Sequence, residues 1–175
     1  MTRITAFTIL IGTVLLAAEH TQASENGFTE YGGNWTMQGD ELTVDGGAGS
    51  KLVSDFPAFT TGEVGVEILF PTRTGGNAGF IVKTSDCDIG ADRFNGYEIA
   101  LETSGRLVVG RHRQNFESIR AVPCDVPVNQ WISLVVKMTE TTLDVIVDGQ
   151  RIIQYEDREH PLRRGQVGLR NWQRG

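Results

Sequence analysis

The feature that most constrains the fold is a succession of short stretches in which apolar and polar residues alternate or β-branched residues run together. Gly, Asp or Asn separates these stretches, and no 3.6-residue apolar period continues past the N-terminal residues. A period of two predicts β-strands, because successive side chains of a strand point to opposite faces. The strands are expected at residues 34–38, 41–44, 50–54, 63–70, 78–84, 96–102, 106–112, 117–122, 131–139, 142–147, 151–155 and 166–171.

The turns between these stretches carry residues that favour reversal of the chain. Asp148-Gly149, between LDVIV and RIIQY, gives the strongest hairpin signal. Ser104-Gly105 marks a further turn. About a dozen short strands with no helix between them indicate an all-β fold, either an antiparallel sandwich or a barrel.

The N-terminus has the composition of a secretory signal peptide. Arg3 precedes an apolar run over residues 4–18, and small residues follow. The run is shorter than the roughly 20 apolar residues of a membrane span, so a signal peptide is favoured over a membrane anchor. Cleavage is expected after Ala23, with Ala18 as the second choice. Residues 1–23 are then the leader, and residues 24–175 form one domain of a secreted, periplasmic or extracellular protein without membrane contact.

Charge and cysteine content limit the partners and the compartment. The net charge of −6 argues against nucleic acid, whose phosphates need a basic surface. The two cysteines are Cys87 and Cys124, and export favours a disulfide between them over two free thiols. The sequence has no CxxC motif, HExxH motif or His/Cys cluster, so no zinc site is predicted.

The order of motifs along the chain resembles a known family. A glycine-rich loop precedes NAGFIV, FNGYEIAL and GRLVVGRHRQNF, and these are followed by NQWISLVVKM, LDVIVDGQRIIQY and GQVGLRNW. This order is similar to the laminin-G-like, concanavalin A-like jelly rolls. More narrowly, it resembles the group that holds the 3-keto-disaccharide hydrolase domain and the family 66 carbohydrate-binding modules. The resemblance covers residues 34–172 and implies a two-sheet antiparallel jelly-roll sandwich.

The end of the sequence departs from the family pattern. In the family a further strand follows the segment GLRNW and pairs near the N-terminal strand, whereas here three residues follow Trp172. The jelly roll is therefore expected either in a shortened complete form or without its last strand. The resemblance then implies an unpaired edge at residues 34–38.

The resemblance also implies a site for a terminal sugar on one sheet. Carboxylates accept hydrogen bonds from adjacent hydroxyls, guanidiniums donate them, and apolar sugar faces stack on aromatic rings. On this pattern a glutamate accepts, two arginines donate and a tryptophan is the stacking platform. The candidate ligand-binding residues are Glu98, Arg111, Arg170, Trp172, His112 and Arg93.

Structural roles are open for some of these residues. Strand alternation puts Tyr97 on the face opposite Glu98, and His112 on the face opposite Arg111. Glu98 and Arg111 are expected to share a face, where they could instead form a cross-strand ion pair. Trp172 could be a terminal core residue instead of a platform. The core is also the expected place of the remaining tryptophans, Trp35 and Trp131.

An acidic loop raises the question of a cofactor. Asp86, Asp88 and Asp92 lie within seven residues, and calcium prefers clustered oxygen ligands. The spacing departs from the EF-hand loop, which ends in a glutamate. A solvated acidic loop is therefore favoured over a calcium site, and no other cofactor is predicted.

Three classes of function are compatible with the sequence: a carbohydrate-binding domain, a glycoside-cleaving enzyme and a scaffold for protein contacts. A glycosidase needs two carboxylates flanking the bond, and many jelly-roll glucanases carry them as ExDxE. The sequence has no ExDxE motif and no recognisable Ser/His/Asp arrangement, although Glu98 and Glu102 could form a dyad. Non-catalytic binding of an oligo- or polysaccharide is favoured. A glycoside hydrolase of the 3-keto-disaccharide hydrolase type is the alternative, and an extracellular protein-interaction scaffold is the second.

Overall fold

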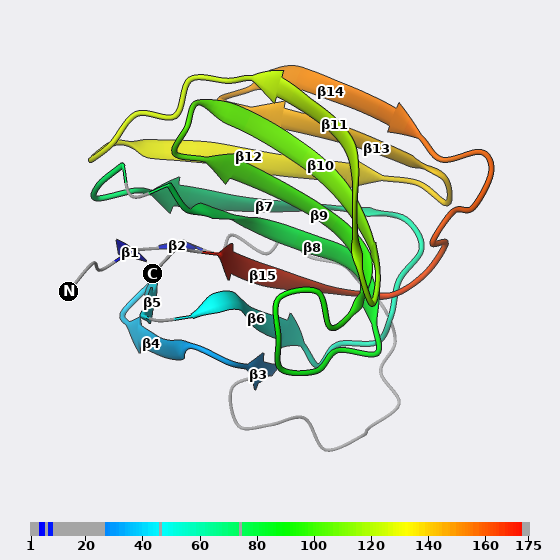
Figure 1. Cartoon of the computed structure of the whole chain (residues 1–175), viewed down its shortest axis with the longest axis horizontal. Coiled ribbons are helices and arrows are strands. Elements are labelled where there is room, and N and C mark those ends of the chain that lie inside the picture. Colours follow the sequence, from blue (N-terminus) through cyan, green and yellow to red (C-terminus); the bar gives the residue numbers. More distant parts are fainter. Residues whose placement is uncertain (1–3, 6, 9–26, 46, 74, 173–175) are drawn as a thin grey trace.

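Two antiparallel sheets form the body of the protein (Figure 1). The computed structural model describes residues 4, 5, 7, 8, 27–45, 47–73 and 75–172. The larger sheet contains β3 (Phe28–Tyr31), β6 (Ala48–Ser54), β8 (Asn77–Ser85), β9 (Asn95–Glu102), β10 (Arg106–Arg113), β11 (Phe116–Pro123) and β15 (Gln166–Trp172). Their spatial order is β11-β10-β9-β8-β15-β6-β3. We call this the seven-stranded sheet.

The second sheet packs against the seven-stranded sheet. It contains β2 (Phe7–Thr8), β7 (Gly62–Leu69), β12 (Trp131–Met138), β13 (Thr142–Val147) and β14 (Gln150–Glu156). Their order is β14-β13-β12-β7-β2. A smaller sheet at one end contains β1 (Ile4–Thr5), β4 (Asn34–Gln38) and β5 (Glu41–Asp45), with β5 in the middle. All pairings between these strands are antiparallel.

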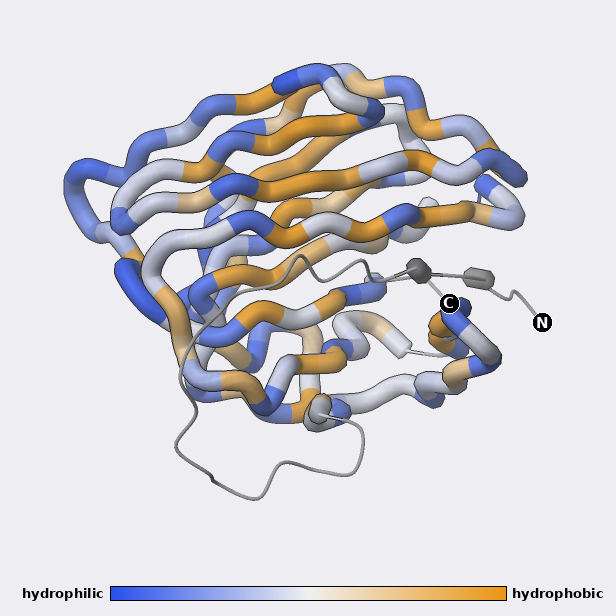
Figure 2. Tube along the Cα trace, turned by 180° about the vertical axis from the view of Figure 1, so that it is seen from behind, coloured by the Kyte–Doolittle hydropathy of each residue, from blue (hydrophilic) through white to orange (hydrophobic). Residues whose placement is uncertain are grey.

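The main hydrophobic core lies between the two large sheets. Ile99 and Leu101 of β9 and Leu134 and Val136 of β12 are all fully buried members of it. Figure 2 shows the apolar stretches along the strands and the hydrophilic residues at the turns. Burial of each such aliphatic side chain contributes about 1.5–3 kcal/mol, so the alternating residues facing the other sheet hold the sandwich together.

The seven-stranded sheet has a second buried cluster on the face turned away from the main core, which we call the outer face. Val53, Ile81 and Phe94 are buried there, with Cys87 packed against them. Ile81 lies between Phe80 and Val82, both of which belong to the main core. Strand alternation therefore gives this sheet two buried faces, and the loop after β8 supplies the cover for the outer one.

Each strand expected from the sequence is present, and its ends differ from the expectation by at most two residues. The sequence interpretation missed β3, which has four residues and lies at the edge of the seven-stranded sheet. Among the described residues β4 pairs with β5 alone, so residues 34–38 form an edge as expected. The antiparallel sandwich, one of the two architectures that the alternation allowed and the one that the family resemblance implied, is confirmed.

The predicted leader is only partly within the described residues. β1 pairs with β5, and β2 pairs with β7. Ala18 and Ala23, the two expected cleavage points, lie outside the described residues, so cleavage stays a prediction. Among the described residues, no helix has the length and apolar character needed to cross a bilayer.

The expectation for the tryptophans is half right. Trp35 packs against the main core, as predicted. Trp131 is 41% exposed, so its expected burial is wrong. It is the first residue of β12 and pairs with Leu69 on the face of the second sheet that points away from the core.

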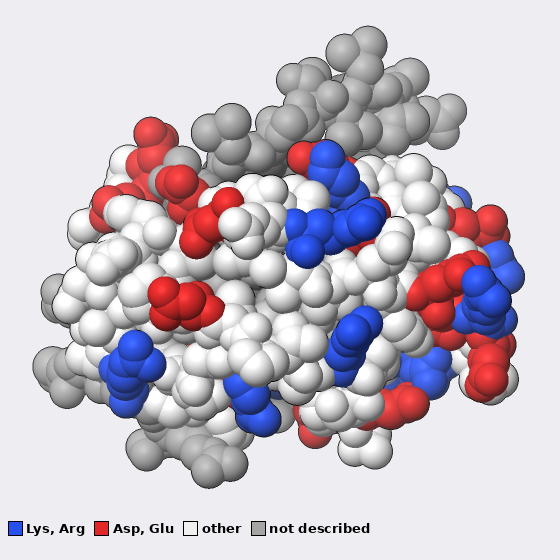
Figure 3. All heavy atoms as spheres, turned by 90° about the horizontal axis from the view of Figure 1, so that it is seen from above, with Lys and Arg blue, Asp and Glu red and all other residues white. Residues whose placement is uncertain are grey.

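The surface carries charges of both signs in small groups. Figure 3 shows Lys and Arg interspersed with Asp and Glu on the face seen from above. Exposed ion pairs of the protein include Lys137–Glu63 and Arg158–Glu156.

Candidate functional site

Three charged or titratable side chains form a buried group on the outer face of the seven-stranded sheet. Glu98 accepts a hydrogen bond from Arg170 Nη1 at 2.6 Å through Oε1, and its Oε2 lies 2.8 Å from His112 Nε2. Glu98 is 3% exposed, Arg170 4% and His112 0%. We call these three residues the outer cluster. Both carboxylate oxygens of Glu98 are therefore engaged, as a buried charge requires.

Three strands position the outer cluster. Glu98 is on β9, and its cross-strand neighbour on β10 is Gly110. His112 follows two residues later on β10, so it lies on the same face. Arg170 comes from β15 and must reach across β8, where its neighbour is Gly79, a residue without a side chain. The cluster therefore depends on the order β10-β9-β8-β15 within the sheet.

The loop after β8, residues 86–94, covers the outer cluster, and we call it the capping loop. Arg170 Nη2 donates to Ala91 O at 3.2 Å, and Lys51 Nζ donates to Gly90 O at 2.6 Å. Lys51 is itself fully buried and also donates to Gly49 O. Burial lowers the pKa of Lys51, and the nearby charge of Arg170 lowers it further. Two buried cations thus hold the loop through its backbone carbonyls.

His112 contacts two aromatic rings. Its ring stacks on Phe94 at a centroid distance of 4.0 Å, and the ring of Phe116 is tilted against it at 5.2 Å. Asp92 Oδ1 lies 3.6 Å from His112 Nδ1. Among the described residues, buried polar atoms without a hydrogen-bond partner include His112 Nδ1 and Arg170 Nε. Such unpaired groups are uncommon in protein interiors and are found at functional sites.

Arg111 does not join the outer cluster. Its cross-strand neighbour is Tyr97, a member of the main core, so Arg111 and Glu98 lie on opposite faces of the sheet. Arg111 bonds Glu117 through Nε and Nη2, and Asp157 through Nη1 at 2.8 Å. The expectation that Glu98 and Arg111 share a face, as ligand residues or as an ion pair, is therefore wrong. A ligand role for Arg111 itself stays a prediction.

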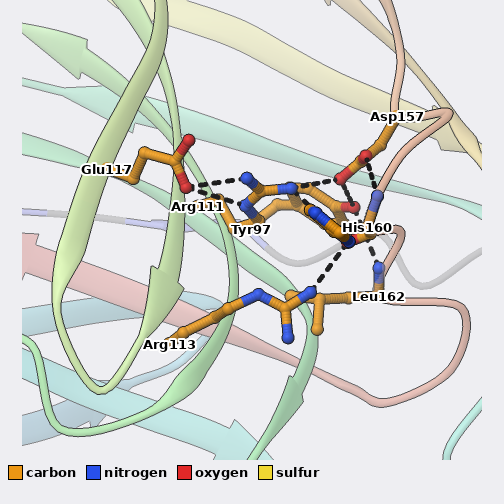
Figure 4. Close-up of polar contacts among 7 residues, drawn as sticks. All are labelled: Tyr97, Arg111, Arg113, Glu117, Asp157, His160 and Leu162. Atoms are coloured by element: carbon orange, nitrogen blue, oxygen red, sulfur yellow. Dashed lines mark hydrogen bonds and ion pairs between the residues drawn. The ribbon is translucent and has the colours of Figure 1, made fainter.

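Arg111 belongs to a second polar group, which we call the rim cluster (Figure 4). Its other members are Tyr97, Glu117, Asp157, His160 and Leu162. Asp157 Oδ2 also accepts from the Tyr97 hydroxyl at 2.7 Å, and that hydroxyl accepts from Leu162 N at 3.0 Å. Burial alone would raise the pKa of Asp157, but the hydrogen bonds from Tyr97, His160 N and Arg111 outweigh it and lower the pKa. Burial and the bond to Asp157 raise the pKa of Tyr97. These bonds fasten the segment after β14 to the seven-stranded sheet.

The remaining predicted site residues lie near the outer cluster or along the same face. Arg93 is in the capping loop, where its exposed guanidinium lies 3.5 Å from Asp88 Oδ2. Trp172 pairs with Asn77 on β8, in phase with Arg170, and is half-buried. Trp172 lies two positions beyond Arg170 along β15, a rise of about 7 Å. Of the six predicted residues, the structure brings together Glu98, His112 and Arg170.

The predicted disulfide between Cys87 and Cys124 is wrong, because both residues are free thiols. Cys87 follows β8 beside Thr84, while Cys124 donates its backbone N–H to Gly105 O at the far end of β9. The eight residues of β9 separate the two ends by about 25 Å. Cysteine Cα atoms must lie within about 7 Å to form a bond.

The acidic loop does not assemble a metal site among the described residues. Asp86 accepts hydrogen bonds from Ser85 and Asn95. Asp88 accepts from its neighbouring backbone at Ile89 and faces Arg93, whereas Asp92 faces His112. The three carboxylates thus have different partners and do not converge on one point.

The sequence interpretation missed four residues that build this site. Lys51 and Phe94 hold the capping loop and His112, and Phe116 borders the cluster. Asp92 had been considered only as a calcium ligand. A sequence signal existed for Lys51, which is a charged residue inside the apolar stretch GSKLVS. No pattern pointed to Phe94 or Phe116, because their role depends on how the loops fold back.

Comparison with known proteins agrees with this architecture. The sequence profile of the family described as the 3-keto-alpha-glucoside-1,2-lyase-like domain matches residues 21–174. No curated protein matches the chain in sequence.

Solved structures share the fold at low sequence identity. The carbohydrate-binding module CBM66 from Bacillus subtilis superposes with a TM-score of 0.71 at 17% identity, covering 84% of this chain and 88% of that one. A Bacillus subtilis protein of unknown function with a galectin-like fold gives 0.67 at 10% identity, covering 84% and 83%. The lumenal domain of VIP36, in a Ca²⁺/Man3GlcNAc-bound form, gives 0.63 at 13% identity, covering 88% and 79%.

These likenesses concern the arrangement of the strands, since identities this low do not carry residue roles from one protein to another. The family profile is different evidence, because it matches the sequence itself over nearly its whole length. The chain therefore belongs to the family of 3-keto-alpha-glucoside-1,2-lyase-like domains.

Proposed function

We propose that this chain is an exported domain that binds carbohydrate without cleaving it, on the outer face of the seven-stranded sheet. The observation that carries the proposal is the outer cluster, a buried acid, base and guanidinium placed outside the main core. An ion pair that only stabilises the fold does not need to be buried outside the main core. Preorganised polar groups at the wall of a ligand site do, because they must be held rigidly before the ligand arrives.

The chemistry of the site suits hydroxyl groups. Sugar hydroxyls both donate and accept, so they pair with carboxylates such as Asp92 and with guanidinium or imidazole N–H groups. The unpaired His112 Nδ1 and Arg170 Nε offer two further polar partners at the same place. Two of the similar solved structures support carbohydrate as the ligand, since one is named a carbohydrate-binding module and another holds Man3GlcNAc.

Burial sets a condition on access. Glu98, His112 and Arg170 are at most 4% exposed, whereas Asp92 at the edge of the cluster is 43% exposed. A sugar that stays at the edge meets Asp92 first. A sugar that reaches His112 must displace the part of the capping loop that Arg170 and Lys51 hold.

The proposal is tested by calorimetric titration with a panel of soluble glycans that includes fructans and arabinoxylan. The wild-type protein is expected to give saturable heat with at least one glycan and to leave that glycan intact. Glu98→Gln keeps the shape of the side chain but removes its charge, so affinity is expected to fall about tenfold or more. Glu63→Gln is the matched control, since Glu63 is an exposed acid on the second sheet. Absence of heat from folded wild-type protein with every glycan would contradict the proposal.

A second candidate function is elimination on a 3-keto-glucoside, and one observation favours it. The Glu98–His112 pair resembles an acid–base dyad, in which the carboxylate orients the imidazole and the opposite nitrogen handles the proton. If Nε2–H donates to Glu98, Nδ1 carries the lone pair, and it has no hydrogen-bond partner among the described residues.

In that reaction Nδ1 would take the proton from C2, which the neighbouring C3 carbonyl makes acidic. The electron pair would form a C1–C2 double bond while the C1–O bond breaks and the leaving group departs with its electrons. Incubation with a 3-keto-α-glucoside and chromatography of the products tests this reaction. Released aglycone that is lost in Glu98→Gln and retained in Glu63→Gln would replace the binding proposal with a lyase.

A further inference from the structure

Phe116 has an unusual place at the border of the outer cluster. It is the first residue of the edge strand β11 and is 40% exposed. Its ring lies directly over Gly110 of β10, because a Cβ built on Gly110 would fall 2.2 Å from Phe116 Cε2. Any side chain at position 110 would push the ring off the sheet. The pair therefore creates a flat aromatic surface on the outer face, seated on backbone.

Burial in the core does not explain this position. The side chains that pack from β11 against the main core are Ile119 and Val122, on the other side of the sheet. The ring of Phe116 instead packs against the imidazole of His112, with 5.2 Å between the ring centroids, and Phe116 is 40% exposed to solvent. An exposed aromatic ring among polar groups is a common feature of binding surfaces.

Asp92 stands beside the same imidazole. Its carboxylate lies 3.6 Å from His112 Nδ1 and is 43% exposed. His112 thus has two exposed neighbours, a flat ring and a carboxylate, and their common contact with one imidazole keeps them within reach of one sugar residue. Among the described residues Asp92 makes no hydrogen bond through its side chain to Arg93, which pairs with Asp88 instead.

We propose that Phe116 is the platform on which a neutral pyranose residue stacks, while Asp92 accepts hydrogen bonds from its hydroxyls. This inference rests on the proposed carbohydrate binding and names the ligand class of that site. The C–H groups on one face of a pyranose fit an aromatic ring, and adjacent hydroxyls fit a carboxylate. The ligand is a neutral sugar residue because the exposed carboxylate of Asp92 would repel the carboxylate of a uronic acid.

The test compares Phe116→Ala, Phe116→Tyr and the control Phe56→Ala, all in the full chain. Phe56 is a 56% exposed phenylalanine in the segment between β6 and β7. The probe is the neutral glycan that binds best to the wild-type protein in the calorimetric panel. Phe116→Ala is expected to weaken binding about tenfold or more, whereas Phe116→Tyr and Phe56→Ala stay within about threefold of wild type. Asp92→Asn is expected to weaken binding and to reduce the discrimination against uronic-acid glycans.

Fluorescence distinguishes direct contact between residue 116 and the sugar from an indirect effect of residue 116 on the structure of the site. In Phe116→Trp the new indole replaces the ring that meets the sugar, so the glycan should change its fluorescence, while Phe56→Trp should show no such change. Wild-type affinity in folded Phe116→Ala, or a silent indole at position 116 while the glycan binds, would overturn the inference and leave carbohydrate binding intact. Binding of uronic-acid glycans in preference to neutral ones would overturn the ligand class. A wild-type protein that binds no glycan would overturn both proposals.

Discussion

Ala91 of the capping loop lies directly against Gly49 at the start of β6. A Cβ atom built on Gly49 would fall 2.3 Å from Ala91 Cα, and Gly49 has a φ of +82°. The close approach lets Lys51 and Arg170 reach the carbonyls of Gly90 and Ala91. The absence of a side chain at residue 49 is thus a condition for covering the outer cluster.

Gly49→Ala is therefore expected to cost more stability than the backbone conformation alone explains. The positive φ costs about 1 kcal/mol, and displacement of the loop adds to it, for a total of about 2 kcal/mol or more. Gly149→Ala is the matched control, since its φ is +77° and no atom lies within 4 Å of the added Cβ. Urea denaturation of both variants gives the comparison. Equal losses would show that the loop does not depend on this contact.

Arg170→Met is expected to destabilise the fold by about 3 kcal/mol, because it leaves the buried carboxylate of Glu98 without its guanidinium partner. The double variant Glu98→Gln/Arg170→Met should recover part of that loss, since it removes the unpaired charge. A double-mutant cycle from urea denaturation measures the coupling. Additive losses would contradict the account of Glu98 and Arg170 as one buried unit.

Lys83 is expected to make stability rise with pH in the alkaline range. It is 2% exposed and donates to Thr139 O and Glu140 O, and burial lowers its pKa from 10.5 to about 8. Between those values the unfolded chain holds a proton that the folded chain has released, so unfolding becomes less favourable as pH rises. The gain by pH 9.5 should be about 1–2 kcal/mol relative to Lys83→Met. Parallel pH profiles for the two proteins would argue against the shift.

Asp157 is expected to make the stability of the protein fall at acidic pH. Its lowered pKa means that its contribution is present above the unfolded pKa of about 3.9 and is lost as pH falls through the folded value. Asp157→Asn should therefore be less stable than wild type at pH 7, with a difference that shrinks below pH 4. Urea midpoints at several pH values provide the measurement. A difference that grows on acidification would contradict this sign.

The two cysteines are expected to be free thiols. A thiol titration of unreduced protein in denaturant should count both Cys87 and Cys124, because the length of β9 separates them. Denaturant is needed, since burial raises the pKa of both thiols and slows their reaction in the folded state. A count of zero would mean that the fold around the capping loop differs from the one described.

The strands could be predicted from the sequence because alternation is a property of each strand by itself. The pairing register between neighbouring strands, which decides which of their side chains share a face, could not be predicted in the same way. Tyr97 pairs with Arg111 and Glu98 with Gly110, whereas the sequence interpretation had placed Glu98 and Arg111 on one face. That error is a register slip of one residue, which the turn after Glu102 decides and which moves every side chain to the other face.

The candidate site was predictable only in part for a similar reason. Glu98, His112 and Arg170 come from three strands, and their candidacy followed from residue type and family resemblance. Their mutual contacts depend on strand order, and their burial depends on the capping loop. Phe116 owes its position to the missing side chain of Gly110, a relation that appears only after the strands are paired. The contacts within the site are determined by how the loops pack on the sheet, so local sequence patterns do not predict them.

The most direct test of the central claim is a ¹H–¹⁵N correlation spectrum of the protein, titrated with the glycan that gives the largest heat in calorimetry. The account predicts that the shifted amides gather on the outer face of the seven-stranded sheet, in the capping loop and around Asp92, His112 and Phe116. Shifts that gather instead on the far face of the second sheet, around Trp131 and Val135, would contradict it, as would a spectrum that no glycan changes.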